Sequence, residues 1–394
     1  MISYLFPPLY GGAGMQALRL AQALTRRDIC VTVLTARHHA DLPVCEILEG
    51  VTIRRLPALG GPGLRPASFF ISAALYLLRH RNLYNIIHLH GAYRSVIPLV
   101  TVARLAGQRT VVKMSQMGTD DPLTSRQRRF GGMLLKALAH TDAVVAITNE
   151  LAESYSQAGL SPSRLICIPN GVDTTTFHPT NPAVRRKLRE TLGLKLDAPV
   201  ALFVGFVHPR KGVDRLLNIW PKVQECCPSA TLLLVGPSRG LSDSVPVDFV
   251  QRLDRFAETY NVRPTGQRSK VHLFYQAADV FVLPSRREGL PNALLEAMAC
   301  GLPSISSSLN GISEVIEPNT NGLLVPLDDD NALAESILHV LNNLGEAEKL
   351  GQAARRCILE HYSLDAVATR YVKLYTSLVK QGGIETVQRS NTFR

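Results

Sequence analysis

Residues 285–301 read SRREGLPNALLEAMACG, and this stretch carries the clearest structural pattern of the chain. The apolar run at 279–283 that precedes them is typical of a buried strand, and the run at 293–300 predicts a helix. Pro291 suits a helix start because its missing N–H is no loss there, and Gly301 suits the helix end. The stretch is therefore expected to form a strand, a loop and a helix in that order.

Two carboxylates lie within this unit, Glu288 in the loop and Glu296 in what we expect to be the first helical turn. A helix N-terminus directs N–H groups and the positive end of the helix dipole toward one place, which favours an anion such as phosphate. Carboxylates on either side of that place can accept hydrogen bonds from hydroxyls. A nucleotide sugar has this chemistry. A surface loop Glu and a dipole-stabilising Glu explain the spacing equally well when it is taken alone.

The first half of the chain alternates short apolar runs with helical patterns, which predicts a parallel sheet covered on both faces. Right-handed crossovers then give a doubly wound, Rossmann-like α/β domain. The expected strands are 2–6, 30–34, 51–56, 86–89, 110–112 and 143–147, and the expected helices are 13–25, 67–79, 95–106, 128–140 and 150–157.

The second half repeats this plan, so we expect a second Rossmann-like domain. A chain of 394 residues is also long for a single core. The turn-rich stretch at 169–173 marks the boundary. The expected strands are 200–204, 231–235, 271–274, 280–283, 304–306 and 323–325, and the expected helices are 213–226, 250–260, 293–300, 331–342, 347–361 and 364–379.

The composition is that of an ordinary globular α/β protein, with 46% hydrophobic and 19% charged residues. The seven cysteines are scattered without metal-ligand spacing, which favours a reducing, cytoplasmic setting. Residues 1–8 lack signal-peptide character, and no apolar run approaches the roughly 20 residues that span a bilayer. We therefore expect a soluble or peripheral protein.

The net charge of +11 is concentrated in residues 1–150, which hold 17 Lys and Arg against 8 Asp and Glu. Such a basic half could face an anionic membrane or an acidic acceptor. No nucleic-acid-binding module is recognisable, so no nucleic-acid partner is expected. A solvated basic face accounts for much of the excess without any partner.

Two further turns follow expected strands and precede helices. Gly11 and Gly12 let backbone N–H groups approach an anion, although a glycine-rich turn alone is a weak signal. Gly205 begins the second turn, GFVHPRKG, in which Arg210 and Lys211 could neutralise a departing diphosphate. A basic surface turn is the plain alternative.

Taken together, these stretches resemble GT-B glycosyltransferases of family 4. The resemblance rests on the E-x(7)-E pattern within ADVFVLPSRREGLPNALLEAMACGLPSI at 278–305, on the residues 311–316, and on NGLLVP at 321–326. It extends over residues 2–378. It implies two Rossmann-like domains facing across a cleft, with domain 1–173 taking the acceptor and domain 174–361 the donor. It also implies that helix 362–380 packs back on the first domain, and residues 381–394 are expected to be a disordered tail.

The resemblance further implies a retaining transfer of a sugar, in the hexosyltransferase class, from a nucleotide sugar to a hydroxyl. Glu296 would hold the ribose and Glu288 a sugar hydroxyl, while Lys211 and Arg210 would bind the diphosphate. Gly11 and Gly12 would touch the donor phosphate or the acceptor. The remaining expected donor-binding residues are Gly205, Gly289, Leu290, Asn292, Ala293 and Leu294.

The chain departs from the family pattern in two places. Many relatives have Arg directly after the glycine of the second turn, where this chain has Phe206. Many also have a His after the fifth strand, where this chain has KMSQMG at 113–118. His90, at the end of the fourth expected strand, is a substitute by position, and a core or capping role explains it as well.

No metal or other cofactor is expected. The D-x-D string at 328–330 follows a strand and precedes a helix, so helix capping explains it better than metal binding. The acceptor implied by family habit and by the basic first half is a saccharide or lipid-linked saccharide of surface polysaccharide or glycolipid synthesis. Two alternatives remain open: a nucleotide-sugar epimerase and a non-catalytic nucleotide-sugar binding protein.

The helix expected at 67–78 is apolar nearly all round, so burial in the core is the first expectation. The alternative is docking on an anionic membrane, which would place the protein on the inner face of the cell membrane. The arginines that could face a membrane or acceptor are Arg65, Arg79, Arg81, Arg126, Arg128 and Arg129.

Overall fold

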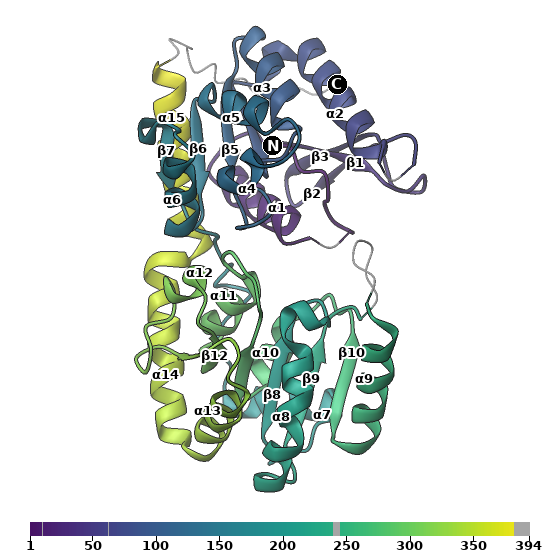
Figure 1. Ribbon diagram of the computed structural model, residues 1–394, viewed down its shortest axis with the longest axis vertical. Coiled ribbons are helices and arrows are strands. Elements are labelled where there is room, and N and C mark those ends of the chain that lie inside the picture. The colour runs from purple at the N-terminus through teal and green to yellow at the C-terminus, as the bar shows by residue number, and fades with distance from the viewer. Residues whose placement is uncertain (10, 62, 239–244, 382–394) are drawn as a thin grey trace. The chain divides into compact units, whose positions relative to one another are not determined.

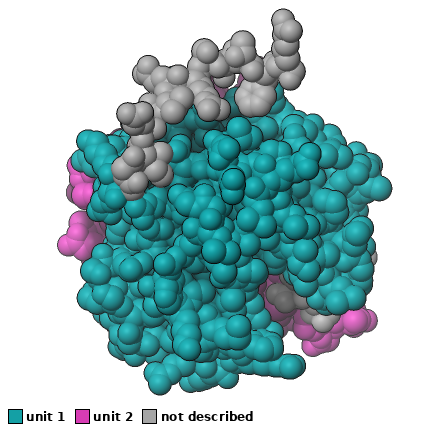
Figure 2. All heavy atoms as spheres, turned by 90° about the horizontal axis from the view of Figure 1, so that it is seen from above, with its two compact units in different colours: residues 1–171, 364–394 teal, residues 172–363 magenta. Residues whose placement is uncertain are grey.

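The structure is a computed structural model, and it divides into two compact units (Figure 2). Unit 1 comprises Met1–Gly171 and Leu364–Arg394, and unit 2 comprises Val172–Ser363. The expected division at residue 173 is two residues away from this boundary. The residues described are 1–9, 11–61, 63–238 and 245–381, so the expected disordered tail lies almost wholly outside them.

The strands of unit 1 form two hydrogen-bonded groups. One has three strands in the order β2-β3-β1, and the other has four in the order β4-β5-β6-β7. Ile2 bridges both β1 and β4, so the chain start joins the two groups. All the pairs are parallel except β2 with β3. The strands are β1 (Thr32–Arg37), β2 (Cys45–Leu48), β3 (Val51–Pro57), β4 (Ile86–His90), β5 (Arg109–Lys113), β6 (Ala143–Ala146) and β7 (Leu165–Cys167).

Helices connect these parallel strands, and α15 returns to the unit from the far end of the chain (Figure 1). Tyr371, Leu374 and Leu378 of α15 share one buried apolar cluster with α1 and the strands of unit 1. The helices are α1 (Gly12–Thr25), α2 (Arg65–Arg79), η1 (Arg81–Leu83), α3 (Val96–Leu105), α4 (Pro122–Arg126), α5 (Gly131–Ala139), α6 (Asn149–Gln157), η2 (Pro162–Arg164) and α15 (Leu364–Gln381).

Unit 2 has a six-stranded, wholly parallel sheet in the order β10-β9-β8-β11-β12-β13. Four of its strands, β8, β9, β11 and β12, are almost entirely buried, as expected for a sheet covered on both faces. The strands are β8 (Val200–Val204), β9 (Thr231–Val235), β10 (Val262–Gly266), β11 (Val280–Leu283), β12 (Ser304–Ser307) and β13 (Leu323–Val325).

The strand order of unit 2 reverses between β8 and β11, which lie next to each other. In an open α/β sheet, ligands bind outside the carboxyl ends of the strands at such a switch point. The helices are α7 (Pro182–Thr191), η3 (Pro209–Lys211), α8 (Val213–Cys226), α9 (Val247–Thr259), α10 (His272–Ala277), α11 (Asn292–Ala299), α12 (Asn310–Ser313), α13 (Asp330–Asn342), α14 (Leu344–Cys357) and η4 (Ile358–Tyr362).

The doubly wound α/β class is confirmed, while several element assignments were wrong. The strand expected at 271–274 is the helix α10, and the third strand of unit 2 is β10, just before it. Its sequence, VRPTG, contains a proline and a glycine, which are unusual within strands and masked the signal. The strand expected at 2–6 is reduced to the bridge at Ile2.

The expectation of a fully buried helix at 67–78 is wrong for one face of α2. Phe69, Ala73 and Leu77 are buried at spacings of four residues, whereas Ile71 and Leu75 are each 62% exposed. The helix contacts α3 and β3, and the stripe with Ile71 and Leu75 is left exposed. Within the described part of the chain, no helix combines the length and apolarity that crossing a membrane would require.

Candidate active site

The expected donor-binding residues lie on two loops at the switch point of unit 2 and on the helix α11 that follows the second loop. One follows β8 and runs through η3, and the other follows β11 and leads into α11. Gly205 begins the first loop with a φ of +152°, a conformation that a side chain disfavours. A Cβ on the neighbouring Gly236 would lie 1.9 Å from the carbonyl oxygen of Gly205, so the two strand ends approach closely only because residue 236 is a glycine.

Lys211 and Glu288 join these two loops directly. The Nζ of Lys211 donates to both carboxylate oxygens of Glu288, at 2.7 and 2.9 Å. The Ser285 hydroxyl donates to the same carboxylate at 2.7 Å. Only 6% of the Glu288 side chain is exposed, so its charge is balanced by Lys211 rather than by water. The structure thus places an ammonium and a carboxylate side by side at the carboxyl end of the sheet.

Gly212 allows the two loops to approach this closely. It has a φ of +76°, and a Cβ at this position would lie 1.9 Å from the carbonyl oxygen of Pro284. The Ser285 hydroxyl also lies 3.4 Å from the carbonyl of Lys211. A side chain at position 212 would therefore separate Lys211 from the loop that carries Glu288.

Glu296 lies in the second turn of α11, not in the first turn as expected, because the helix begins at Asn292. Its carboxylate accepts a hydrogen bond from the Tyr275 hydroxyl at 3.0 Å, and both side chains are buried. Sequence reasoning missed Tyr275, which lies on α10, because that segment was interpreted as a strand. The N–H of Leu294 donates to the carbonyl of Pro291 at 3.2 Å, so this expected phosphate donor is already engaged within the first turn.

Phe206, which stands where many relatives have Arg, supports the first loop. Its ring stacks on that of His208, with centroids 5.4 Å apart and an interplanar angle of 16°. The Nδ1 of His208 accepts the N–H of Arg210 at 2.9 Å and so caps η3, the turn that carries Lys211. The stack of Phe206 on His208 and the hydrogen bond to the His208 ring nitrogen therefore stabilise the loop. Arg210 is the residue next to Lys211 in this loop.

The remaining expected site residues lie in unit 1. Gly12 is the first residue of α1, and Gly11 is its N-cap with extended backbone. The close approach in this turn occurs at Gly14, where a Cβ would lie 2.3 Å from the carbonyl oxygen of Leu5. The expected contact of Gly11 and Gly12 with phosphate or acceptor stays a prediction.

His90 is the last residue of β4 and is buried, with its ring 4.3 Å from that of His88. Within the described residues, neither ring nitrogen of His90 has a hydrogen-bond partner, whereas the Nδ1 of His88 lies 2.7 Å from the Tyr375 hydroxyl of α15. Burial, reinforced by the nearby Lys113 ammonium, lowers the pKa of both histidines. Both rings are therefore neutral near pH 7. The catalytic role proposed for His90 by position stays a prediction.

A buried polar group beside these histidines was missed from the sequence. Lys113, the last residue of β5, pairs in register with His90 and donates to the side-chain oxygen of Asn170 at 2.9 Å. Burial lowers the pKa of Lys113 to about 7, and the Asp120 carboxylate offsets part of this effect. The sequence feature that could have indicated this buried group is the lysine that ends the apolar run TVVK at 110–113.

Asp120 organises the loop after β5, the place where many relatives carry a His. It accepts the N–H of Gln116 at 2.7 Å and the N–H and hydroxyl of Ser115 at 3.0 and 2.9 Å. Burial raises the pKa of Asp120, and these hydrogen bonds oppose that shift. The loop is thus shaped by one buried carboxyl group that receives several donors.

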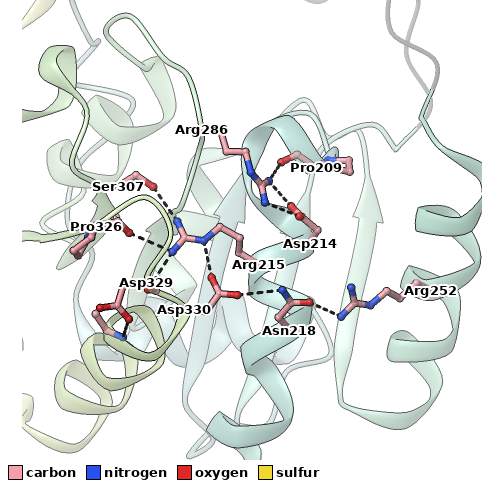
Figure 3. Close-up of polar contacts among 11 residues, drawn as sticks. Pro209, Asp214, Arg215, Asn218, Arg252, Arg286, Ser307, Pro326, Asp329 and Asp330 are labelled. Carbon is pink, nitrogen blue, oxygen red and sulfur yellow. Dashed lines mark hydrogen bonds and ion pairs between the residues drawn. The ribbon is translucent and has the colours of Figure 1, made fainter.

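Two of the three aspartates at 328–330, Asp329 and Asp330, have structural partners. Asp329 caps α13 by accepting the N–H of Ala332 at 2.8 Å, in agreement with the capping interpretation. Asp330 binds the Nε of the buried Arg215 at 2.7 Å and the amide of Asn218 at 3.1 Å (Figure 3). Over the described residues, no group of three or more His, Cys, Asp or Glu side chains is arranged to hold a metal ion.

Family models match both halves of the chain. The model described as Glycosyltransferase Family 4 matches residues 10–176, and the model described as Glycosyl transferases group 1 matches residues 198–343. The second match contains both switch-point loops, and the first contains His90 and the Gly11–Gly12 turn.

Individual relatives extend over nearly the whole chain. A D-inositol 3-phosphate glycosyltransferase of Xylanimonas cellulosilytica is 29% identical, with 94% of this chain and 93% of the relative aligned. An alpha-maltose-1-phosphate synthase of Mycolicibacterium smegmatis is 26% identical, with 95% and 98% aligned.

Solved structures share the fold. Anabaena HepE in complex with UDP and glucose superposes with a TM-score of 0.77 at 18% identity, covering 95% of this chain and 98% of that one. Sucrose-phosphate synthase from Thermosynechococcus elongatus gives a TM-score of 0.77 at 24% identity, covering 96% and 98%. The family models, the relatives and the fold agree, and the chain belongs to family 4 of the GT-B glycosyltransferases and is a glycosyltransferase enzyme.

Proposed function

We propose that the enzyme transfers a sugar, in a hexosyltransferase reaction, from a nucleoside-diphosphate sugar to a hydroxyl acceptor with retention of anomeric configuration. The observation that carries the proposal is the contact of Lys211 with Glu288 at the switch point of unit 2, beside the start of α11. A cation, a carboxylate and a helix N-terminus gathered there suit a ligand that combines phosphates with hydroxyls.

In this proposal, Lys211 and Arg210 bind the diphosphate, and their positive charges stabilise the negative charge that develops as it leaves. Glu288, relieved of Lys211 by the incoming phosphate, accepts a hydrogen bond from a sugar hydroxyl. Glu296 accepts one from a ribose hydroxyl while Tyr275 holds its other oxygen. The amides at the start of α11, on Asn292 and Ala293, face the same phosphates.

The retaining step proposed follows family behaviour. The acceptor oxygen forms a bond to the anomeric carbon on the face from which the phosphate departs, while the bond from that carbon to the phosphate oxygen breaks. The acceptor proton passes to the leaving phosphate. This route needs no second catalytic carboxylate, in keeping with a site in which Glu288 is the carboxylate nearest the cation.

The relatives support a nucleotide donor and a hydroxyl-bearing acceptor. The HepE structures hold UDP and UDP-glucose, and the D-inositol 3-phosphate glycosyltransferases are named for an acceptor with hydroxyls and phosphate. A lipopolysaccharide enzyme, WaaG, shares the fold with a TM-score of 0.73. We propose a saccharide or lipid-linked saccharide acceptor of surface polysaccharide or glycolipid synthesis for this enzyme.

We also propose that transfer requires no metal ion, since Lys211 and Arg210 supply positive charge where the diphosphate would lie. Within the D-x-D string at 328–330, Asp330 already binds Arg215, and Asp329 caps α13. Activity that survives exhaustive treatment with a chelator supports this proposal, and activity restored only by added divalent cation contradicts it.

We propose in addition that the enzyme works in the cytoplasm as a peripheral protein on the inner face of the membrane. The exposed stripe of α2, with Ile71 and Leu75, supports this location, and Arg65 and Arg79 at the two ends of the helix add positive charge to it. An amphipathic helix with arginines at its ends suits an anionic lipid surface.

Incubation with single nucleotide sugars tests the proposed reaction. The panel is UDP-glucose, UDP-N-acetylglucosamine, ADP-glucose and GDP-mannose, each with and without a candidate acceptor and followed by mass spectrometry. Transfer, or slow hydrolysis to the free sugar, supports the proposal. Conversion of a donor to its epimer without transfer would instead support the epimerase alternative.

A further inference from the structure

A second ion pair holds the same two loops together on the outside of the Lys211–Glu288 pair. The guanidinium of Arg286, in the loop after β11, makes two parallel hydrogen bonds of 2.8 Å to the carboxylate of Asp214, in the first turn of α8 (Figure 3). It also donates to the carbonyl of Pro209. One side chain therefore reaches both ends of the turn that carries Lys211.

The backbone adds another bond between the same segments. The N–H of Arg286 donates to the carbonyl of Arg210 at 3.1 Å, so residue 286 contacts residues 209, 210 and 214 at once. Lys211 lies within this span, and Glu288 is two residues beyond Arg286. The spacing between the Lys211 ammonium and the Glu288 carboxylate thus depends on how residues 284–288 lie against residues 209–214.

We propose that Arg286 and Asp214 form a positioning clamp that fixes Lys211 against Glu288 and so prepares the diphosphate site. Neither residue contacts the reacting groups in this proposal, which rests on the proposed function. Arg286 acts through Lys211, by immobilising the turn from Pro209 to Asp214.

Arginine suits this task better than lysine. Its planar guanidinium binds a carboxylate at two points and still has a hydrogen left for the Pro209 carbonyl. A lysine ammonium is a single point and cannot reproduce the fork. A simple exposed ion pair stabilises a fold only slightly, so loss of Arg286 should disturb the local geometry more than the global stability.

A comparable arginine contact lies elsewhere in unit 2, where the carboxylate is also bound by Arg189. Arg185 also donates to one carboxylate, that of Asp279, and to one backbone carbonyl, that of Ala278. The side-chain exposures are similar, 36% and 22% for Arg185 and Asp279 against 42% and 24% for Arg286 and Asp214. Arg185 lies on α7, away from both switch-point loops, so Arg185→Ala is a matched control.

The reactivity of Lys211 toward an acylating reagent tests the clamp without a donor. The full-length parent, Arg286→Ala, Arg286→Lys, Asp214→Asn and Arg185→Ala are labelled with the N-hydroxysuccinimide ester of acetic acid, and each lysine is quantified by mass spectrometry. We expect Lys211 to react about threefold faster in Arg286→Ala and Asp214→Asn, since local opening exposes it. Arg286→Lys should be intermediate, and Arg185→Ala should match the parent.

Lys211 reacting at the parent rate in Arg286→Ala, or equally fast in Arg185→Ala, would overturn the proposal. With the donor that the nucleotide-sugar panel identifies, Arg286→Ala should lower kcat about tenfold without changing the KM of the acceptor. Absence of transfer from every donor by the parent would reject the proposed function, and the labelling result would still decide whether Arg286 positions Lys211.

Discussion

Lys211 and Glu288 neutralise each other across two loops that are 77 positions apart in the sequence. Their contact of 2.7 Å occurs where the strand order of unit 2 reverses, because β8 and β11 are neighbours there. The contact is therefore made by the fold of unit 2 itself. A phosphate that binds Lys211 would free the Glu288 carboxylate for a hydroxyl of the same ligand.

Glu288→Gln and Lys211→Ala should each lower transfer by about 10²–10³-fold, as expected for loss of one preorganised charged group at a reacting centre. Lys211→Ala should also destabilise unit 2 by about 1–3 kcal/mol, because it leaves a buried carboxylate without its cation. Kinetics and denaturant unfolding measure the two effects.

The double variant Lys211→Ala with Glu288→Gln separates these roles. It should recover most of the lost stability, since no buried charge is left, yet remain inactive. Recovery of activity together with stability would show that the pair serves the fold and not the reaction.

Tyr275→Phe should raise the dissociation constant of the nucleotide about fivefold, the equivalent of about 1 kcal/mol for one hydrogen bond. The reason is that Glu296 loses the hydroxyl that holds its carboxylate. Isothermal titration with the nucleoside diphosphate of the identified donor measures this. The control is Tyr155→Phe, because the buried Tyr155 hydroxyl has no hydrogen-bond partner in the described parts of the chain. Equal dissociation constants of the nucleotide for parent and Tyr275→Phe would show that Tyr275 does not contribute to nucleotide binding.

The titration of Lys113 should make the free energy of unfolding increase with pH. Burial lowers its pKa to about 7 in the folded chain, whereas an unfolded lysine has a value near 10.5. Between these values the unfolded chain binds more protons, so raising the pH favours the folded state by up to about 1.4 kcal/mol per pH unit. Below pH 7 the cost of burying the charge is fully present.

Lys113→Met removes this titration. The difference in unfolding free energy between parent and variant, measured from about pH 6.5 to about pH 9.5, should shift in favour of the parent as the pH rises. A difference that stays constant over this range would mean that Lys113 is not buried as a titrating group.

Tyr371→Ala should lower the stability of unit 1 by about 3–5 kcal/mol, because a fully buried aromatic side chain of α15 leaves a cavity in its core. Hydrogen exchange should show faster exchange in unit 1 than in unit 2. Lys373→Ala, at an exposed position of the same helix, should have little effect. Uniform loss of protection in both units would contradict an independent core for unit 1.

Binding to vesicles should depend on the exposed stripe of α2. Ile71→Ser with Leu75→Ser should reduce co-sedimentation with anionic lipid vesicles several-fold at low salt, and higher salt should weaken binding of the parent. Leu344→Ser, at an exposed position in unit 2, serves as the control. Failure of the parent to bind anionic vesicles at low salt would reject the membrane location.

Local signals in the sequence were sufficient for much of the fold. Pro291 and Gly301 delimit a helix within one residue of α11, and the buried runs at 200–204, 231–235 and 280–283 coincide with β8, β9 and β11. These elements are predictable because burial on both faces of a parallel sheet leaves an unbroken apolar run. β10 was missed because VRPTG is a poor strand sequence, and only pairing with β9 makes it one.

The sequence by itself determined that Glu288, Arg210 and Lys211 lie in loops and turns after strands and that Glu296 lies on the helix that follows, since residue type and local pattern carry that information. Only the tertiary structure decided which of them meet. The contacts of Lys211 with Glu288, Arg286 with Asp214 and Tyr275 with Glu296 each join separate segments through the order of strands in the sheet. That order results from packing the whole unit, and no local pattern encodes it.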